Sequence, residues 1–100
     1  MELVIDLDGT ICEEKPAAQR CLAKPLPGAK EALLKLRKHK HVIIIFSARP
    51  WTDYNMTEHW LKTNNIPYDR LILGKPIGDL YIDDRAWHFD TWATIIKKII

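Results

Sequence analysis

Short apolar runs and longer periodic stretches alternate along the chain, and each pattern predicts its own kind of element. The runs Leu3–Ile5 and Val42–Phe46 predict strands, and the second is typical of a strand buried on both faces of a parallel sheet. Arg70–Leu73 and Leu80–Ile82 are predicted as the third and fourth strands. The pattern therefore predicts four short strands.

Between the strands, apolar residues recur every three or four positions, which is the period of a helix packed on one side. The predicted helices begin after Pro27-Gly28, run from Thr52 or Asp53 through Thr63, and occupy Asp90–Ile100. Residues 11–26 are predicted to form a loop, with a short helical turn allowed at Ala17–Leu22. Alternating strands and helices predict one α/β domain over residues 1–100, with a parallel sheet and right-handed crossovers.

Polar side chains gather directly after each predicted strand. In chain order they are Asp6 and Asp8, then Ser47 and Arg49, then Lys75, and finally Asp83 and Asp84. In open parallel sheets the ligand site lies beyond the carboxyl ends of the strands, where these residues would meet. Asp6 and Asp8 are two positions apart, so in an extended segment they point to the same side. Two such like charges favour a hard cation, and Mg²⁺ is the natural choice.

These residue types form a coherent set for phosphoryl transfer. Asp6 is expected to attack phosphorus and form an aspartyl-phosphate, while Asp8 protonates the leaving oxygen and then activates water. Mg²⁺ is expected to be held by Asp6, by the backbone carbonyl of Asp8 and by Asp83. Ser47 would donate a hydrogen bond to a phosphoryl oxygen, and Lys75 would neutralise its charge.

The turn after Asp6, with Gly9 and Thr10, is expected to offer backbone N–H groups as an anion cradle. Arg49 has two open interpretations: it contacts phosphate directly, or it is merely a surface charge or a structural ion-pair partner of Asp53. Asp84 is expected to support the site indirectly rather than bind the metal.

The four motifs DLDGT, IIIFSAR, GKP and YIDD, in this order, resemble the haloacid dehalogenase (HAD) superfamily. The resemblance covers essentially the whole chain. It implies a Rossmann-like, three-layer parallel sheet and an Mg²⁺-dependent phosphohydrolase with an aspartate nucleophile. In that resemblance Asp6 matches the nucleophile, Asp8 the acid/base, Ser47 and Lys75 the phosphate ligands, Asp83 the metal ligand, and Asp84 its support.

A narrower similarity concerns substrate. The stretches around KPLPGAKEALLKL and LILGKPIGDLYIDDRAW resemble small capless HAD proteins often linked to capsule or lipopolysaccharide biosynthesis. SAR and DDR are also similar to the phosphatase half of phage-type polynucleotide kinases, where an arginine at the place of Arg49 assists phosphate binding. The segment from Ile11 to Lys24 leaves no room for a cap domain.

We therefore expect a phosphatase acting on a small phosphorylated metabolite such as a sugar phosphate. One alternative is a nucleic-acid end phosphatase, which a basic stripe near Arg49, Arg85 and Lys62 would favour. The other is a non-catalytic binding or scaffold domain, against which an intact Asp6 and Asp8 argue.

Composition adds limits rather than chemistry. A hydrophobic fraction of 47%, a charged fraction of 28% and a net charge of +2 describe an ordinary globular domain with no required nucleic-acid partner. Cys12 and Cys21 have neither metal nor disulfide spacing, and no apolar run has membrane-spanning length, so a cytoplasmic protein without membrane contact is expected.

Two apolar groups have open roles. The isoleucines of the last predicted helix exceed what a small domain easily hides, which makes a homo-oligomer an open expectation. Trp51 and Tyr54 either flank the mouth of the site or pack on the core, and core packing is the favoured interpretation.

Overall fold

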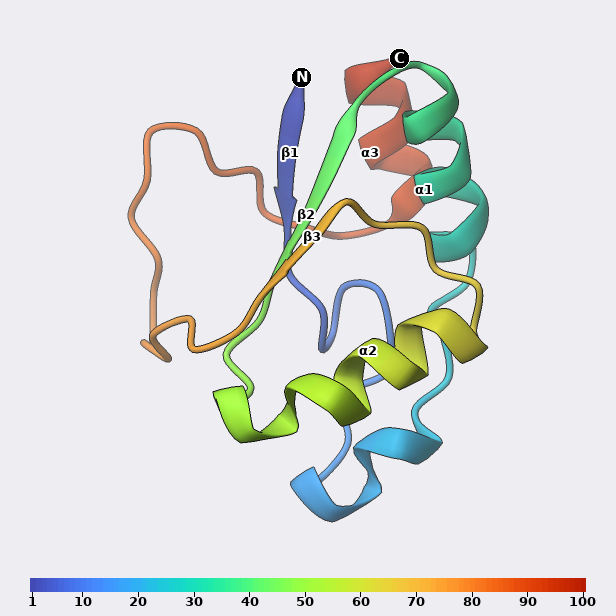
Figure 1. Ribbon diagram of the computed structural model, residues 1–100. Helices are drawn as coiled ribbons and strands as arrows, with labels where there is room; N and C mark the ends of the chain where they lie inside the picture. The colour runs from blue at the N-terminus through green and yellow to red at the C-terminus, as the bar shows by residue number, and fades with distance from the viewer.

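Three parallel strands form the sheet of the computed structural model, which describes residues 1–100 (Figure 1). They are β1 (Glu2–Ile5), β2 (Val42–Phe46) and β3 (Arg70–Ile72), adjacent in the order β1-β2-β3. Val4 lies opposite Ile44 in the register of the first pair. The first three predicted strands are thus confirmed, the second with the predicted bounds.

The helices also follow the predicted pattern. They are the 3₁₀ helices η1 (Ala17–Leu22) and η2 (Trp51–Asp53) and the α-helices α1 (Ala29–Lys38), α2 (Tyr54–Thr63) and α3 (Trp92–Ile99). Asp53, one of the two expected starts of this helix, makes no capping hydrogen bond at α2 and pairs instead with Arg20, at 3.2 Å. Thr91 caps α3, because its hydroxyl accepts from the backbone N–H of Thr94 at 3.2 Å.

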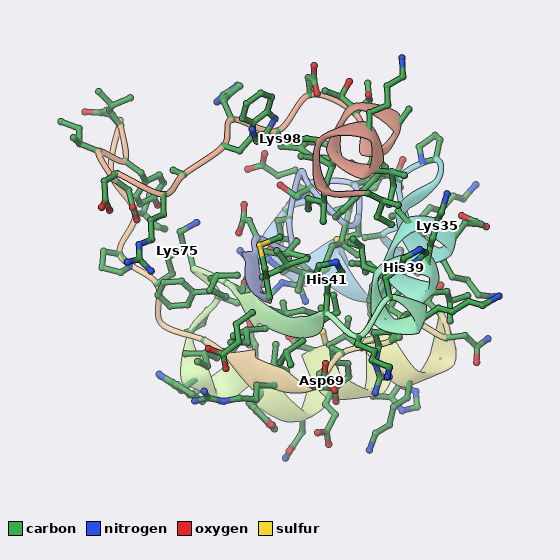
Figure 2. The ribbon with its side chains drawn as sticks, turned by 90° about the horizontal axis from the view of Figure 1, so that it is seen from above. Lys35, His39, His41, Asp69, Lys75 and Lys98 are labelled. Carbon is green, nitrogen blue, oxygen red and sulfur yellow. The ribbon has the colours of Figure 1, made fainter.

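One face of the sheet carries the core. Alternate strand residues point to opposite faces, and Ile43, Ile45 and Leu71 are buried on the same side. Helices α1 and α3 lie side by side over this face, as Figure 2 shows. Buried residues of α2, Trp60 and Leu61, belong to the same cluster. Consecutive neighbouring strands with right-handed crossovers place both connecting helices on one face, which explains this one-sided core.

The expected fourth strand and the third layer do not form. No strand or helix occurs between Gly74 and Asp90, and Leu80–Ile82 is exposed. The sheet face that includes Val4 therefore lacks a covering helix, and Val4 is exposed. A three-residue apolar run makes a strand only when it pairs with a neighbour, and here it finds none. The architecture is thus α/β, with helices on one face of a three-stranded parallel sheet.

Two buried tryptophans fasten distant segments to the core. The indole N–H of Trp60 donates to the carbonyl of Ala23 at 2.9 Å, so α2 holds the end of η1. The indole N–H of Trp92 donates to the carbonyl of Thr10 at 2.8 Å, so α3 holds the turn that follows β1. Both bonds satisfy a polar group that would be costly to bury alone.

The last helix hides most of its apolar surface within the monomer. Ile95, Ile96 and Ile99 are partly buried against the core cluster, whereas Ile100 stays exposed. The prediction of a homo-oligomer stays a prediction. None of the helices is long and apolar enough to span a bilayer.

Candidate active site

The loops after β2 and β3 are joined by backbone hydrogen bonds at the carboxyl ends of the strands. The N–H of Ser47 donates to the carbonyl of Ile72 at 2.9 Å, and the N–H of Lys75 donates to the carbonyl of Ser47 at 2.9 Å. The N–H of Gly74 donates to the carbonyl of Arg49, also at 2.9 Å. The loops after β2 and β3 therefore hold each other in a fixed position beside the loop after β1.

The turn after β1 is closed by its own backbone. The carbonyl of Leu7 accepts from the N–H groups of Thr10 at 3.1 Å and of Ile11 at 2.8 Å, while the N–H of Gly9 donates to Cys12 at 2.8 Å. Gly9 has φ +81°, a conformation that favours glycine. The N–H groups of Gly9 and Thr10 are thus engaged within the turn, which disagrees with the expectation that they cradle an anion.

Two other backbone donors face no such competition. The N–H groups of Asp8 and Ala48 donate to no backbone carbonyl. They belong to the loops that follow β1 and β2, where a backbone N–H without a protein acceptor can bind an anion. The N–H of Asp8 belongs to the turn after Asp6 that is expected to offer such donors. Sequence reasoning missed the N–H of Ala48, because a backbone donor carries no side-chain signature and depends on the shape of its turn.

Asp8 is held by Arg49 in a two-pronged ion pair. The Nε of Arg49 lies 2.9 Å from Oδ2 of Asp8, and its Nη2 lies 2.7 Å from Oδ1. The Arg49 side chain is fully buried, and that of Asp8 is 20% exposed. A paired guanidinium and carboxylate with two parallel hydrogen bonds form a strong and directional contact. Arg49 thus forms a structural ion pair, as one of its interpretations expected, but its partner is Asp8 rather than Asp53.

The remaining donors of Arg49 also point into the protein. Its Nη1 donates to the hydroxyl of Thr57 on α2 at 3.0 Å, and Nη2 lies 4.0 Å from the sulfur of Cys12. Burial lowers the pKa of Arg49, but the hydrogen bond and charge of Asp8 outweigh burial and leave that pKa above its ordinary value. Direct phosphate contact by Arg49 would require these protein contacts to break.

Cys12 lies beneath the same pair. Burial first, and then the neighbouring Asp8 charge, raises the pKa of this thiol to about 12. Because a neutral thiol is a poor nucleophile and a poor metal ligand, Cys12 acts as a small buried side chain under Asp8.

Asp6 occupies a different environment. Its Oδ1 lies 3.9 Å from Nζ of Lys75, and its side chain is 39% exposed. Burial raises the pKa of Asp6 and the Lys75 charge opposes that rise, with burial the larger effect. A half-buried carboxylate opposite one lysine is accessible to a small ligand. Asp8 is less accessible, because both of its oxygens are bound by Arg49.

Lys75 is held over two aromatic rings. Its ammonium lies 4.5 Å from the ring centre of Tyr81 and 5.8 Å from that of Phe46. Lys75 lies on the side of the sheet away from α1, as Figure 2 shows. The predicted meeting of Lys75 with Asp6 is thus present in the structure.

Ser47 lies beneath this surface rather than on it. The residue is fully buried, and its hydroxyl oxygen accepts from the N–H of Arg49 at 3.1 Å. Its hydroxyl hydrogen has no acceptor fixed by that bond, so Ser47 can still donate once a ligand oxygen reaches it.

Asp83 and Asp84 lie apart from the other candidate residues. Both are exposed in the segment after Lys75, and the Asp83 carboxylate accepts from the N–H of Arg85 at 2.8 Å. No cluster of three or more acidic, histidine or cysteine side chains is placed to hold a metal ion. Asp83, as it is placed, does not join Asp6 in the expected magnesium site.

An aromatic pair borders the site. Trp51 is 57% exposed and stacks on Tyr54, with ring centres 6.0 Å apart and planes 13° apart. Tyr54 is partly buried against the core. The favoured core interpretation therefore fits Tyr54, while Trp51 matches the alternative of a residue at the mouth.

Comparison with known proteins supports the fold. No protein-family profile and no curated protein sequence matches the chain. The structure is similar to a crystallised target protein from Vibrio cholerae, with 24% identity, a TM-score of 0.74 and 97% of both chains covered. It is also similar to a conserved protein from Bacteroides thetaiotaomicron, with 26% identity, a TM-score of 0.71, and 99% of this chain and 88% of that chain covered.

A third likeness is to part of a much longer chain. A chain of the Pnkp1/Rnl/Hen1 complex, described in one structure as an RNA repair complex, aligns with 23% identity and a TM-score of 0.66. The alignment covers 97% of this chain and 32% of that chain. Taken together, the three likenesses show that this α/β arrangement is one that other proteins adopt along nearly the full length of the present chain.

Proposed function

We propose that this chain is a capless phosphatase of the HAD type that hydrolyses phosphomonoesters through an aspartyl-phosphate on Asp6. The observation that carries the proposal is the meeting of Asp6 with Lys75 at the carboxyl ends of parallel strands, 3.9 Å apart. The unpaired N–H groups of Asp8 and Ala48 add donors for phosphoryl oxygens. The DLDGT, SAR and GKP motifs agree with this assignment.

In the first step an oxygen of Asp6 attacks phosphorus, the bond to the leaving oxygen breaks, and Asp8 gives that oxygen a proton. In the second step water attacks the phosphorus of the aspartyl-phosphate, Asp8 takes the proton, and the bond to Asp6 breaks. Both oxygens of Asp8 accept from Arg49 in the resting structure. A proton on Asp8 would displace one of these bonds, so the contacts support its role as base more directly than its role as acid.

Mg²⁺ is the proposed cofactor. Asp6 and the Asp8 carbonyl supply hard oxygen donors, and a cation there would offset the charge of nucleophile and phosphate. Asp83 would join them only if the exposed segment after Lys75 moved toward β1. The preferred substrate class is a small phosphorylated metabolite such as a sugar phosphate.

Two other functions are weighed by the same contacts. The likeness to part of an RNA repair complex favours a polynucleotide end phosphatase. Of the predicted basic stripe, however, Arg49 is buried and Lys62 is paired with Glu58 at 3.5 Å, which leaves Arg85 as the exposed member without an ion pair. A scaffold function gains from the Asp8–Arg49 pair, because that pair gives Asp8 a purpose without proton transfer. Asp6 has no such structural partner buried with it.

The test is Mg²⁺-dependent release of phosphate from an aryl phosphate by the native chain and by Asp6→Asn. We expect activity that falls at least about a thousandfold in the variant, since no nucleophile remains, and that a chelator abolishes. Asp79→Asn, an exposed carboxylate in the segment after Lys75, serves as the control and should keep native activity. A folded native protein that releases no phosphate from any phosphomonoester would leave the scaffold function in place.

A further inference from the structure

A groove lies between α2 and β3, and Trp51 at one end of it contacts Gly74, the residue before Lys75. The lining of the groove includes Trp51, Tyr54 and Tyr68, and its volume is about 700 Å³. This volume lies in the range of small-molecule sites. We propose that it binds the ring of a small nucleotide-like substrate, with the exposed indole of Trp51 as the stacking surface, and this proposal rests on the proposed phosphatase function.

Trp51 is fixed in position although it is exposed. Tyr54 stacks on it at 6.0 Å. A Cβ at Gly74 would lie 2.8 Å from the indole nitrogen of Trp51, so the edge of the indole rests directly on the backbone at Gly74. An aromatic surface that is held on one side and open on the other loses little freedom when a second ring stacks on it.

The same contact links the groove to the proposed chemistry. Gly74 directly precedes Lys75, whose ammonium lies 3.9 Å from Asp6. The N–H of Gly74 also donates to the carbonyl of Arg49. The loop after β3 therefore contacts the proposed nucleophile through Lys75 and the Trp51 end of the groove through Gly74.

The charges of the groove indicate the size of its ligand. Its lining holds two acidic residues, Glu58 and Asp69, and two basic ones, Lys62 and Arg70. Lys62 is paired with Glu58 at 3.5 Å, and Asp69, labelled in Figure 2, is paired with Arg37 at 3.1 Å. A polynucleotide requires a basic track for its successive phosphates, and a balanced lining does not provide one. The groove suits one uncharged ring system beyond a single phosphate.

The experiment compares adenosine 5′-monophosphate with ribose 5-phosphate, which share phosphate and sugar and differ by the base. We expect the native chain to show a kcat/KM about tenfold higher for the nucleotide, mainly through KM, which is in the range of base stacking. Trp51→Ala should bring this ratio close to one, and Trp51→Phe should keep part of it. Trp87→Ala removes another exposed tryptophan, 52% exposed against 57%, and should leave the ratio at the native value.

Equal kcat/KM for the two substrates in the native chain would overturn the inference, as would a ratio that Trp51→Ala leaves unchanged. A 5′-phosphorylated oligonucleotide preferred tenfold over the mononucleotide would overturn the argument from charge. If no phosphate is released at all, the phosphatase proposal fails separately. Adenosine alone should then still shift the NMR signal of the Trp51 indole N–H, assigned with Trp51→Phe, and an unmoved signal would overturn the inference.

Discussion

Two carboxylates only two residues apart lie in opposite kinds of surroundings. The carboxylate of Asp8 accepts hydrogen bonds at 2.7 and 2.9 Å from the guanidinium of Arg49, whose side chain is fully buried. Asp6 is 39% exposed and faces a single lysine at 3.9 Å. The difference teaches that the pair should not be treated as one acidic cluster. Asp8 is part of the packing that closes the loop, whereas Asp6 is the more exposed carboxylate.

The largest expected effect on stability comes from removing the ion pair of Arg49 with Asp8. Arg49→Met leaves Asp8 charged and without its partner, and it also strands the hydroxyl of Thr57. Losing one member of a buried ion pair is strongly destabilising, so we expect the free energy of unfolding to fall by about 3 kcal/mol. Denaturant-induced unfolding followed by circular dichroism measures the change.

Arg37→Met is the matched control. It removes an arginine from a pair with Asp69 at 3.1 Å, in which the two side chains are 45% and 32% exposed. Such surface pairs contribute less than about 1 kcal/mol. Similar losses of unfolding free energy in the two variants would contradict the contrast between the buried Arg49–Asp8 pair and the solvated Arg37–Asp69 pair.

An intermediate effect on stability is expected at Gly74, which has φ +78° and lies under the indole of Trp51. Gly74→Ala combines an unfavourable left-handed backbone with a contact that the indole must yield, and should cost about 1–2 kcal/mol in unfolding free energy. Gly78→Ala is the control, because its Cβ would meet nothing closer than 3.7 Å and its φ is not positive. If both substitutions proved neutral, Trp51 would not be held by Gly74.

The smallest effect has the opposite sign and concerns Asp6. Burial raises its pKa in the folded state, so the fold prefers the protonated carboxyl and loses stability as the pH rises through that pKa. Asp6→Asn cannot ionise and should therefore be more stable than the native chain at pH 7. The gain should be a few tenths of a kcal/mol, or roughly 1–2 °C in Tm, because the side chain is 39% exposed and solvent screens it.

Thermal unfolding at pH 7 and pH 3 tests both the sign of the change in Tm and the pH range over which it occurs. The gain should vanish at pH 3, where the carboxyl is protonated in the folded and unfolded chains alike. Asp8→Asn is the natural companion, since it deprives Arg49 of its charged partner and should lower Tm at pH 7. A variant pair that moved Tm in the same direction would remove the distinction between the two aspartates.

Local pattern was enough to predict most of the fold. The continuous apolar run of β2 and the three- and four-residue spacing in α1 are signals carried by neighbouring residues, and both elements formed where expected. Leu80–Ile82 carries the same kind of local signal but forms no strand. A strand needs a partner as well as a pattern, and the ring of Tyr81 lies instead over the ammonium of Lys75.

The residue types of the site could be predicted from the sequence, but only one of its two ion pairs could. The proximity of Asp6 and Lys75 could be predicted, because both residues follow strands whose carboxyl ends lie at one edge of the sheet. Arg49 with Asp8 joins residues 41 positions apart, and nothing near Arg49 in the sequence distinguishes Asp8 from Asp53 as its partner. Which acid an arginine meets is decided by tertiary packing, and so are the free N–H groups of Asp8 and Ala48.

The bond from the Trp92 indole to the Thr10 carbonyl has a consequence for the order in which the molecule is completed. It joins residues 82 positions apart, which makes it a contact of very high sequence separation. Such contacts form late because the chain must first close a long loop. During synthesis the turn that carries Asp8 therefore lacks this brace until Trp92, 82 positions after Thr10, has left the ribosome. Any function that depends on that turn becomes available only after α3 has been made.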